Sequence, residues 1–331
     1  MSVSRVVIVN GKVAEEPDVE EAVEQLMSRR GPAAIHVTSS PGDARRIARE
    51  AMSAEEIVVL GGDGTLNEVI SGLRGPDGER GFEGTLAVIP AGTANDFAGS
   101  AGIPTDSPVE AVAALPAYRP VALDLGRVSA GVSDEAEGSG ALFVNVATGG
   151  FGAEISSQAS EELKAVLGRV SYLVAGIAGA GELKPREATI TAPGFERTLA
   201  FYLLAVGNGR RAGGGMPVCP DADPTDGQFD VTIVPEGTVG ATIAEVLRKG
   251  LEGVGNAGIR FRSEWLEVTS PTPLQFNLDG EPYEDRRFSF EVRPAALRVM
   301  LPLDSPLLRR RPEATSSPPP STRSGSAPTR A

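Results

Sequence analysis

The sequence predicts an α/β N-terminal nucleotide-binding domain with a largely parallel sheet, followed by an antiparallel β-sandwich C-terminal domain. Three observations support this fold class. Short apolar runs alternate with amphipathic stretches as far as residue 118, which is typical of βαβ units. After residue 119 the apolar runs are separated by turn residues, with few helical stretches between them. A chain of 331 residues is long enough for two domains, which we place at 1–118 and 119–308.

The elements of the first domain follow from periodicity and end signals. Strands that are separated by helices imply right-handed crossovers and parallel pairing. The helix that starts at Asp43 has Ala44, Ile47 and Ala48 on one face, and Asp43 is its expected N-cap. The predicted elements are strands Arg5–Asn10, Ala33–Val37, Glu56–Leu60 and Thr85–Ile89, and helices Pro17–Arg30, Asp43–Met52, Thr65–Leu73 and Pro108–Leu115.

The second domain is predicted from closely spaced strands. Two stretches within it, Glu161–Gly181 and Thr238–Gly250, have helical periodicity, and Ser129–Gly140 is a polar hairpin loop. The segment 309–331 is rich in Pro, Ser and Arg and should be a disordered basic tail. The predicted strands are Val121–Val128, Ala141–Ala147, Ala188–Thr191, Thr198–Gly207, Phe229–Val234, Trp265–Thr269, Leu274–Leu278, Arg287–Val292 and Leu297–Leu301.

Composition narrows the class of protein. No stretch approaches the roughly 20 apolar residues of a membrane span, and the first residues lack a signal-peptide pattern, so we expect a cytoplasmic protein. The net charge of −13 argues against nucleic acid as a partner. The single Cys219 and single His36 leave too few soft ligands for zinc, so any metal should be a hard cation on oxygen ligands. Five Arg and one Glu in the tail offer a weak membrane contact, although an inert extension is the simpler interpretation.

The run VVLGGDGTLNEV at residues 58–69 joins a buried strand, a glycine turn and a helix start. Glycines let a ligand approach the main chain, and the first-turn amides of a helix favour phosphate. The carboxylate of Asp63 would repel phosphate unless a divalent cation or an acceptor hydroxyl lies between them. That placement indicates phosphoryl transfer, whereas a Gly-Gly-Asp-Gly run by itself is equally typical of a tight turn.

A second run of the same design, LAVIPAGTANDF, occupies residues 86–97. It again joins a strand, a Gly-Thr turn and an Asn-Asp helix start. If the two strands are parallel neighbours, the two glycine turns lie side by side. Open α/β sheets bind their ligands at such a place.

These two runs, GGDGTLNEV and PAGTANDFA, resemble the bacterial diacylglycerol kinase catalytic-domain family, soluble lipid kinases related to sphingosine and ceramide kinases. Further pieces in the family's order are VNVATGGFG at 144–152, AVGNG at 205–209, PDA at 220–222, DG at 226–227 and LDGE at 278–281. The resemblance covers roughly residues 5–302. It implies transfer of the γ-phosphoryl group of ATP to the hydroxyl of diacylglycerol or a similar lipid alcohol, with transient contact at the inner face of the membrane.

The resemblance also implies a set of nucleotide contacts around the two glycine turns and the ends of the first two strands. The family usually carries a longer Asn-Pro-x-Ser-Gly-Lys turn where this chain has Asn10-Gly11-Lys12, which puts contacts by that loop in question. Thr38 is equally well explained as a surface hydroxyl of a strand. The implied ATP-binding residues are Asn10, Lys12, Thr38, Gly61, Gly62, Asp63, Gly64, Thr65, Leu66, Asn67, Glu68, Thr93 and Asn95.

The general base and the metal are implied by two acidic turns. Asp-Gly between two β runs is typical of a hairpin, but the resemblance assigns the proton acceptor to the LDGE motif, with Glu281 first and Asp279 second. Asp63 is a rival for that role. In the family a structural Mg²⁺ is held by the Asp of the later Asp-Gly pair and by two main-chain carbonyls. On this chain those ligands are Asp226, Asp223 and Gln228, although the same turn is also typical of a solvated acidic loop.

Two other functions remain open at this stage. One is an NAD-kinase-like transferase acting on a soluble nucleotide, against which the GTANDFA run and the late DGE stand. The other is a catalytically silent nucleotide or lipid sensor, which the short Asn10–Lys12 loop leaves open. The glycine-rich segment Gly209–Val218 is interpreted as a flexible loop or as a lip of the lipid cleft. Whether the chain forms a homodimer is not determined by the sequence.

Overall fold

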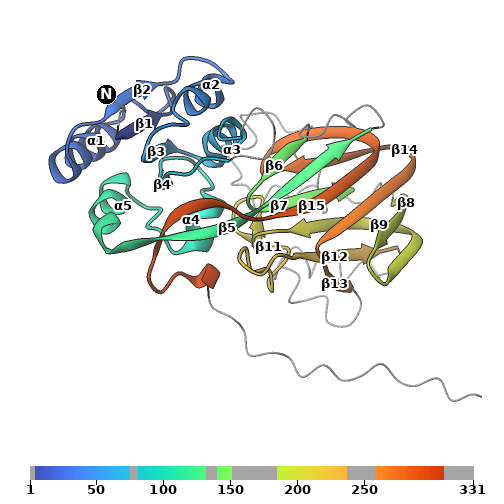
Figure 1. Cartoon of the computed structure of the whole chain (residues 1–331). Helices are drawn as coiled ribbons and strands as arrows, with labels where there is room; N and C mark the ends of the chain where they lie inside the picture. Colours follow the sequence, from blue (N-terminus) through green and yellow to red (C-terminus); the bar gives the residue numbers. More distant parts are fainter. Residues whose placement is uncertain (1–3, 75–80, 132–139, 151–184, 237–257, 309–331) are drawn as a thin grey trace, which may run out of the picture.

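The computed structural model describes residues 4–74, 81–131, 140–150, 185–236 and 258–308 (Figure 1). The two helices predicted at Glu161–Gly181 and Thr238–Gly250 lie outside the described residues. The predicted disordered tail and most of the predicted loop Ser129–Gly140 lie outside them as well.

The N-terminal part of the chain is built on four strands in the order β4-β3-β1-β2, each pair of which is parallel. β3 is buried along its whole length because it lies between β1 and β4. Helix α1 packs against α5, and α2 packs against α3 (Figure 1). The elements are β1 Arg5–Val9, β2 Ala34–Val37, β3 Glu56–Gly61, β4 Thr85–Pro90, α1 Pro17–Arg30, α2 Asp43–Glu50, α3 Asp63–Gly72, α4 Asp96–Ala101 and α5 Pro108–Ala114.

Two helix starts differ from the prediction. Helix α3 begins at Asp63, not at Thr65, so the acidic residue of the first glycine run lies in the first helical turn. The N-cap of α2 is Gly42, in the left-handed conformation that glycine adopts without strain, so the predicted N-cap Asp43 is wrong. The helix start predicted at the Asn-Asp pair of the second glycine run is the short helix α4, with Asn95 as its N-cap, and only its extent was not predicted, because six residues are too few to show a periodicity.

The rest of the described chain consists mainly of antiparallel strands. The two runs predicted at Trp265–Thr269 and Leu274–Leu278 are one strand with a register shift between them. The last two predicted strands are likewise one long strand, β15. The strands are β5 Tyr118–Ala130, β6 Ala141–Phe143, β7 Val146–Gly150, β8 Arg186–Ala192, β9 Phe195–Gly207, β10 Arg211–Ala212, β11 Met216–Pro217, β12 Phe229–Pro235, β13 Ile259–Ser263, β14 Trp265–Leu278 and β15 Glu281–Pro302.

The segment predicted as one strand at Ala141–Ala147 is divided into β6 and β7. β6 pairs with β5, whereas β7 pairs with β9 and β14. The division falls at Val144 and Asn145, whose main-chain amides point to the carboxylate of Asp279 instead of to a neighbouring strand. The change of partner therefore has a local cause in one side chain.

Strands β5 and β15 connect the two parts of the molecule. β15 is antiparallel to β5 over most of its length, and its Val299 pairs with Leu86 of β4 in parallel. Leu123 and Leu301 consequently lie in the same apolar core as the N-terminal strands. A second core contains several stacked or edge-on phenylalanines, such as the edge-on pair Phe276 and Phe288. The division at residue 118 remains a prediction, and the first core extends across it.

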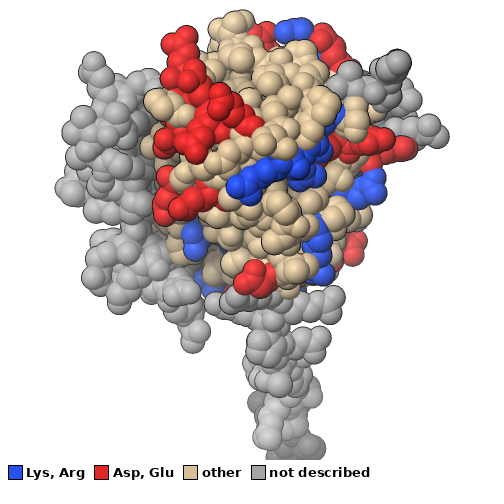
Figure 2. Space-filling view, turned by 90° about the vertical axis from the view of Figure 1, so that its left-hand side faces the viewer, with Lys and Arg blue, Asp and Glu red and all other residues tan. Residues whose placement is uncertain are grey.

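The surface is predominantly acidic, in keeping with the net charge of −13. Figure 2 shows Asp and Glu side chains in several areas of one face, with a band of Lys and Arg side chains between them. No helix in the described part of the chain is long and apolar enough to cross a membrane.

Candidate active site

The two glycine turns are in direct contact, as predicted. β3 and β4 are neighbours, and Gly61 pairs with Pro90 at their carboxyl ends. A Cβ atom added to Gly62 would lie 3.1 Å from the Cα atom of Gly92, and one added to Gly92 would lie closer still to Gly62. Side chains are thus excluded at both positions by backbone packing. The main chains of both turns are brought to one place at the edge of the sheet.

The first turn of α3 presents free amides at this place. Its N-cap residue is Gly62, and no side chain of the described residues caps the helix. The first intrahelical bond runs from the amide of Leu66 to the carbonyl of Gly62 at 3.1 Å, which leaves the preceding amides without an intrahelical acceptor. A Cβ added to Gly64 would meet nothing within 4 Å. This open helix N-terminus is suited to an anion.

Asp63 connects the two glycine turns. Its Oδ1 atom accepts a hydrogen bond from the main-chain amide of Phe97 at 3.2 Å, so the carboxylate of α3's first residue caps α4. Its Oδ2 atom is buried and has no hydrogen-bond partner among the described residues. A buried carboxylate oxygen without a donor is costly, and a ligand or cation would remove that cost.

The loops after β1 and β2 reach the same edge of the sheet. The Nδ2 atom of Asn10 donates to Oγ1 of Thr65 at 2.7 Å, and its Oδ1 atom accepts from the amide of Lys12 at 2.9 Å. The hydroxyl of Thr38 accepts from the amide of Gly11 at 3.0 Å. The short Asn10–Lys12 loop is therefore tied to both neighbouring loops, with the Lys12 side chain exposed.

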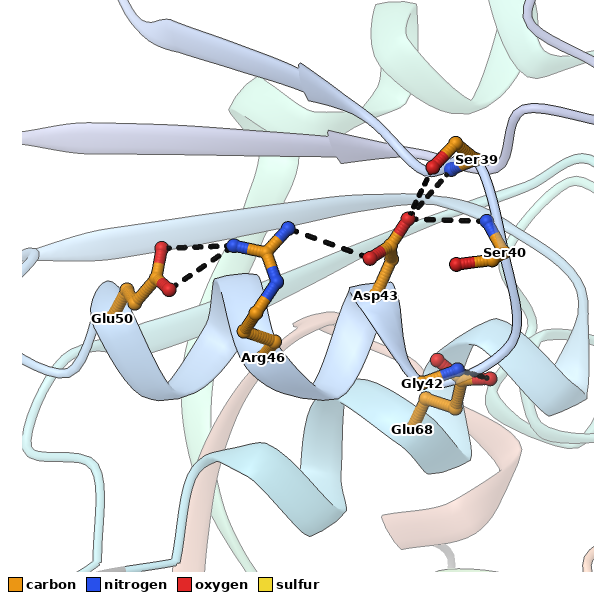
Figure 3. A network of polar contacts seen from close by, with 7 residues as sticks. All are labelled: Ser39, Ser40, Gly42, Asp43, Arg46, Glu50 and Glu68. Atoms are coloured by element: carbon orange, nitrogen blue, oxygen red, sulfur yellow. Dashed lines mark hydrogen bonds and ion pairs between the residues drawn. The ribbon is translucent and has the colours of Figure 1, made fainter.

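Glu68 faces the loop that precedes α2. Its carboxylate accepts a hydrogen bond from the amide of Gly42 at 3.0 Å (Figure 3). In the same loop the Oδ2 atom of Asp43 accepts from the amides of Ser39 and Ser40 and from the hydroxyl of Ser39, which lowers the pKa of this carboxyl group (Figure 3). Asp43 thus stabilises the loop before α2, where it was expected to cap the helix itself.

The side chains of Leu66, Asn67 and Asn95, which were predicted to contact the nucleotide, contact other parts of the protein instead. Asn67 is buried and donates to the carbonyl of Leu142 in the strand β6 at 3.3 Å, and Leu66 lies in the first core. The side-chain amide of Asn95 donates to the carbonyl of Gly92 at 2.8 Å and accepts from its amide at 3.1 Å, which closes the second turn. Thr93 is exposed in that turn.

The two carboxylates of the LDGE motif have different surroundings. Asp279 has a left-handed backbone and accepts hydrogen bonds from the amides of Val144, Asn145 and Val146, at 2.6, 3.1 and 3.1 Å. Burial raises the pKa of Asp279 to about 7, these amides oppose the rise, and the negative charge of Asp63 adds to it. The carboxylate of Asp279 is therefore buried and bound to main-chain amides, whereas Glu281 is exposed at the start of β15.

In the turn predicted to hold Mg²⁺, the carboxylate of Asp226 has a main-chain donor and a cationic neighbour. Oδ1 of Asp226 accepts from the amide of Gln228 at 3.0 Å, and Oδ2 lies 3.3 Å from Nη1 of Arg262. Burial raises the pKa of Asp226. The carboxylate of Asp223 is engaged with Thr225, as expected if only its carbonyl is a ligand. No cluster of three or more acidic, His or Cys side chains suited to a metal occurs among the described residues.

Two buried carboxylates were missed by the sequence analysis. Asp124 accepts from the amides of Gly227 and Ala295, at 2.8 and 2.7 Å, and thereby fixes the acidic turn to β15. The signal was available, since Asp124 is a single acid within an apolar strand. Asp96 accepts from the amides of Gly214 and Gly215 in the hairpin β10–β11. The segment interpreted as a flexible loop or a lip is thus a hairpin bound to the start of α4.

Comparison with known proteins identifies the domain families of the two parts of this chain. Residues 4–128 match the diacylglycerol kinase catalytic domain, and residues 145–301 match the YegS C-terminal NAD kinase beta sandwich-like domain. Two crystal structures from Bacillus anthracis strain Sterne share the fold. One superposes with a TM-score of 0.74 at 23% identity and covers 91% of this chain and 96% of that chain. The other, described as a diacylglycerol kinase, has a TM-score of 0.65 at 20% identity and covers 91% of this chain and 98% of that chain.

Close sequence relatives then define the family. A Pseudomonas aeruginosa protein named "Probable lipid kinase YegS-like" is 42% identical over 313 residues, which cover 92% of this chain and 96% of that protein. A Stenotrophomonas maltophilia protein of the same name is 40% identical over 306 residues and covers 91% of this chain and 97% of that protein. The chain belongs to the YegS-like family of lipid kinases, within the diacylglycerol kinase catalytic-domain class.

Proposed function

We propose that this protein is an ATP-dependent lipid kinase that transfers the γ-phosphoryl group of ATP to the hydroxyl of diacylglycerol or a similar lipid alcohol. The observation that carries this proposal is the contact between the two glycine turns beside the uncapped start of α3. Phosphoryl transfer depends mainly on positioning and on electrostatic stabilisation of phosphate oxygens. Main-chain amides at a helix start supply both without a side chain that must be ordered.

The nucleotide phosphates are proposed to lie against the amides of Gly62, Asp63 and Gly64. Asn10 and Thr38 then act by holding the adjacent loops, since their side chains are engaged with Thr65 and Gly11. Glu68 and Asn95 support the loop before α2 and the second glycine turn, whereas Asn67 holds β6 against α3. Lys12 and Thr93 are exposed and remain available to contact ATP directly.

Glu281 is proposed as the general base. The amides of Val144, Asn145 and Val146 all donate to the carboxylate of Asp279, so this carboxylate is committed to holding the junction between β6 and β7. Glu281 follows two residues later and is exposed. In the proposed step, Glu281 accepts the proton of the lipid hydroxyl, and the oxygen of that hydroxyl forms a bond to the γ-phosphorus of ATP. The bond from that phosphorus to the bridging oxygen breaks, and ADP leaves.

Mg²⁺ is proposed as a structural ion at the acidic turn, held by the carboxylate of Asp226 and the main-chain carbonyls of Asp223 and Gln228. Oxygen ligands of this kind suit a hard cation, which would stabilise the charged form of Asp226 against burial. Arg262 already provides one positive charge at this carboxylate. The ion would therefore share Asp226 with Arg262 or displace it.

The proposed partners are ATP and a membrane lipid, with transient contact at the inner face of the membrane. A single assay tests the proposal: labelled ATP is incubated with the protein and mixed lipid micelles, with NAD, or with no acceptor. We expect label in the lipid fraction only. Label in NADP would instead support a nucleotide kinase. No transfer under any condition, together with retained ATP binding, would support the sensor interpretation.

A further inference from the structure

Four arginines, at the ends of α2 and α3 and on β5 and β15, act on one another through their charges, although the chain as a whole is acidic. Arg49 lies in the last turn of α2, and Arg74 follows the end of α3. Arg127 lies on β5 and Arg293 on β15. We call these four residues the arginine cluster.

Contacts at Gly140 bring two members of the cluster, Arg74 and Arg127, together. Nη1 of Arg74 donates to the carbonyl of Gly140 at 2.8 Å. A Cβ added to Gly140 would lie 3.4 Å from Cγ of Arg127, so these two arginines meet at one glycine. Arg74 also forms a β-bridge with Gly81, where an added Cβ would lie 3.3 Å from the carbonyl oxygen of Ala296 in β15.

One donor of the cluster is left without an acceptor. Nη2 of Arg74 is buried and has no hydrogen-bond partner among the described residues. Arg127, by contrast, forms an ion pair with Glu291 at 2.6 Å. Burial lowers the pKa of Arg74, and the positive charges of Arg127, Arg293 and Arg49 lower it further. A buried guanidinium donor facing like charges costs free energy that a bound anion would recover.

We propose that the arginine cluster binds a phosphate group at a site separate from the nucleotide loops. Guanidinium groups match the tetrahedral oxygens of phosphate through paired N–H donors, which a lysine cluster would not provide. The site is distant from the transferred phosphate, because the helix α3 lies between them. At a rise of about 1.5 Å per residue, Arg74 lies roughly 16 Å along the helix from Asp63. The ligand is a phosphorylated lipid head group or a free phosphate, which present the same chemistry.

The test uses the full-length protein with saturating ADP, so that added phosphate competes little at the glycine turns. Melting temperature is measured against inorganic phosphate for the wild type, Arg74→Gln and Arg127→Gln. The matched control is Arg46→Gln, which removes an exposed arginine of α2 that pairs with Glu50 (Figure 3). We expect half-saturation at a phosphate concentration at least tenfold higher in both cluster variants, and no change in the control.

A second measurement distinguishes the source of the phosphate. Sedimentation with phosphatidylcholine vesicles is compared with and without phosphatidic acid. Loss of phosphatidic acid binding in the cluster variants identifies a lipid head group, whereas unchanged vesicle binding with a weakened phosphate response identifies a free anion. Arg74→Lys retains the charge but loses the paired donors, and should give an intermediate result if Arg74→Gln does not fold.

The proposal is overturned if the phosphate response and the vesicle binding of both cluster variants are the same as those of the wild type.

Discussion

Replacement of Asp63 by Asn and by Ala separates a structural contribution of this carboxylate from its proposed part in phosphoryl transfer. Both variants remove the Asp63 charge, which adds to the rise that burial causes in the pKa of Asp279. Only Asn retains an oxygen that can accept from the amide of Phe97, the bond that caps α4 at 3.2 Å. The difference between the two variants therefore measures the cap alone.

The magnitude follows from that one bond. Loss of an N-cap side chain costs about 0.5–2 kcal/mol of unfolding free energy. For a domain of this size, 1 kcal/mol corresponds to roughly 2–4 °C in melting temperature. We expect Asp63→Ala to melt a few degrees below Asp63→Asn. Both variants should lose phosphoryl transfer by about 10²-fold or more, since each lacks the carboxylate that is proposed to act on the phosphates through a divalent cation or the acceptor hydroxyl.

The assays are urea unfolding of the two variants and initial rates with labelled ATP and mixed lipid micelles. Equal stability of the Asn and Ala variants would show that Asp63 does not cap α4. Near wild-type turnover in Asp63→Asn would remove this residue from the nucleotide site. Unfolding of both variants would instead support the interpretation of the glycine run as a purely structural turn.

Four further predictions concern other parts of the chain. Glu281→Gln should lower turnover by roughly 10²–10⁴ with little change in ATP affinity, and a dead Asp279→Asn beside an active Glu281→Gln would place the base at Asp279. The unfolding free energy should decrease as the pH rises from about 4 to about 7, because the folded protein holds the Asp279 proton more tightly than the unfolded chain does. Urea titrations should show a smaller fall in Asp279→Asn, with the remainder due to Asp230, whose pKa burial raises to about 6. Mg²⁺ should raise the melting temperature of the wild type but not of Asp226→Ala, and an unchanged response would relocate the ion. Truncation after Leu308 should leave the melting temperature unchanged, and any loss of binding to anionic vesicles should shrink at high salt.

Much of the candidate site was predictable because its motifs are local. The strand, the glycine turn and the helix start are formed by consecutive residues. The position of Gly61 to Thr65 at the end of β3 could therefore be predicted from the pattern of apolar residues and glycines. The contact between Gly62 and Gly92 followed from one further assumption, that β3 and β4 are neighbours. The helix start at Asp63 was misplaced by two residues, because helix ends depend on backbone geometry more than on composition.

The partners of polar side chains were not predictable in the same way. Asp279 looked like a hairpin residue or a base, and the structure engages it with amides up to 135 positions away. Asn67 and Asn95 belong to the nucleotide motifs, yet their side chains hold β6 and the second turn. Asp43 satisfies the pattern of an N-cap and instead accepts from the two serines before the helix.

The sequence by itself determined the family, the order of most elements and the glycine turns that define the candidate site. Those properties depend on hydrophobic periodicity and on residues that follow one another directly. Only the tertiary structure decided that Asp63 caps α4, that β5 and β15 join the two cores, and that Arg74 and Arg127 meet at Gly140. Each of these depends on the packing of segments that are distant in the chain, and a local pattern carries no information about which distant group will satisfy a buried donor or acceptor.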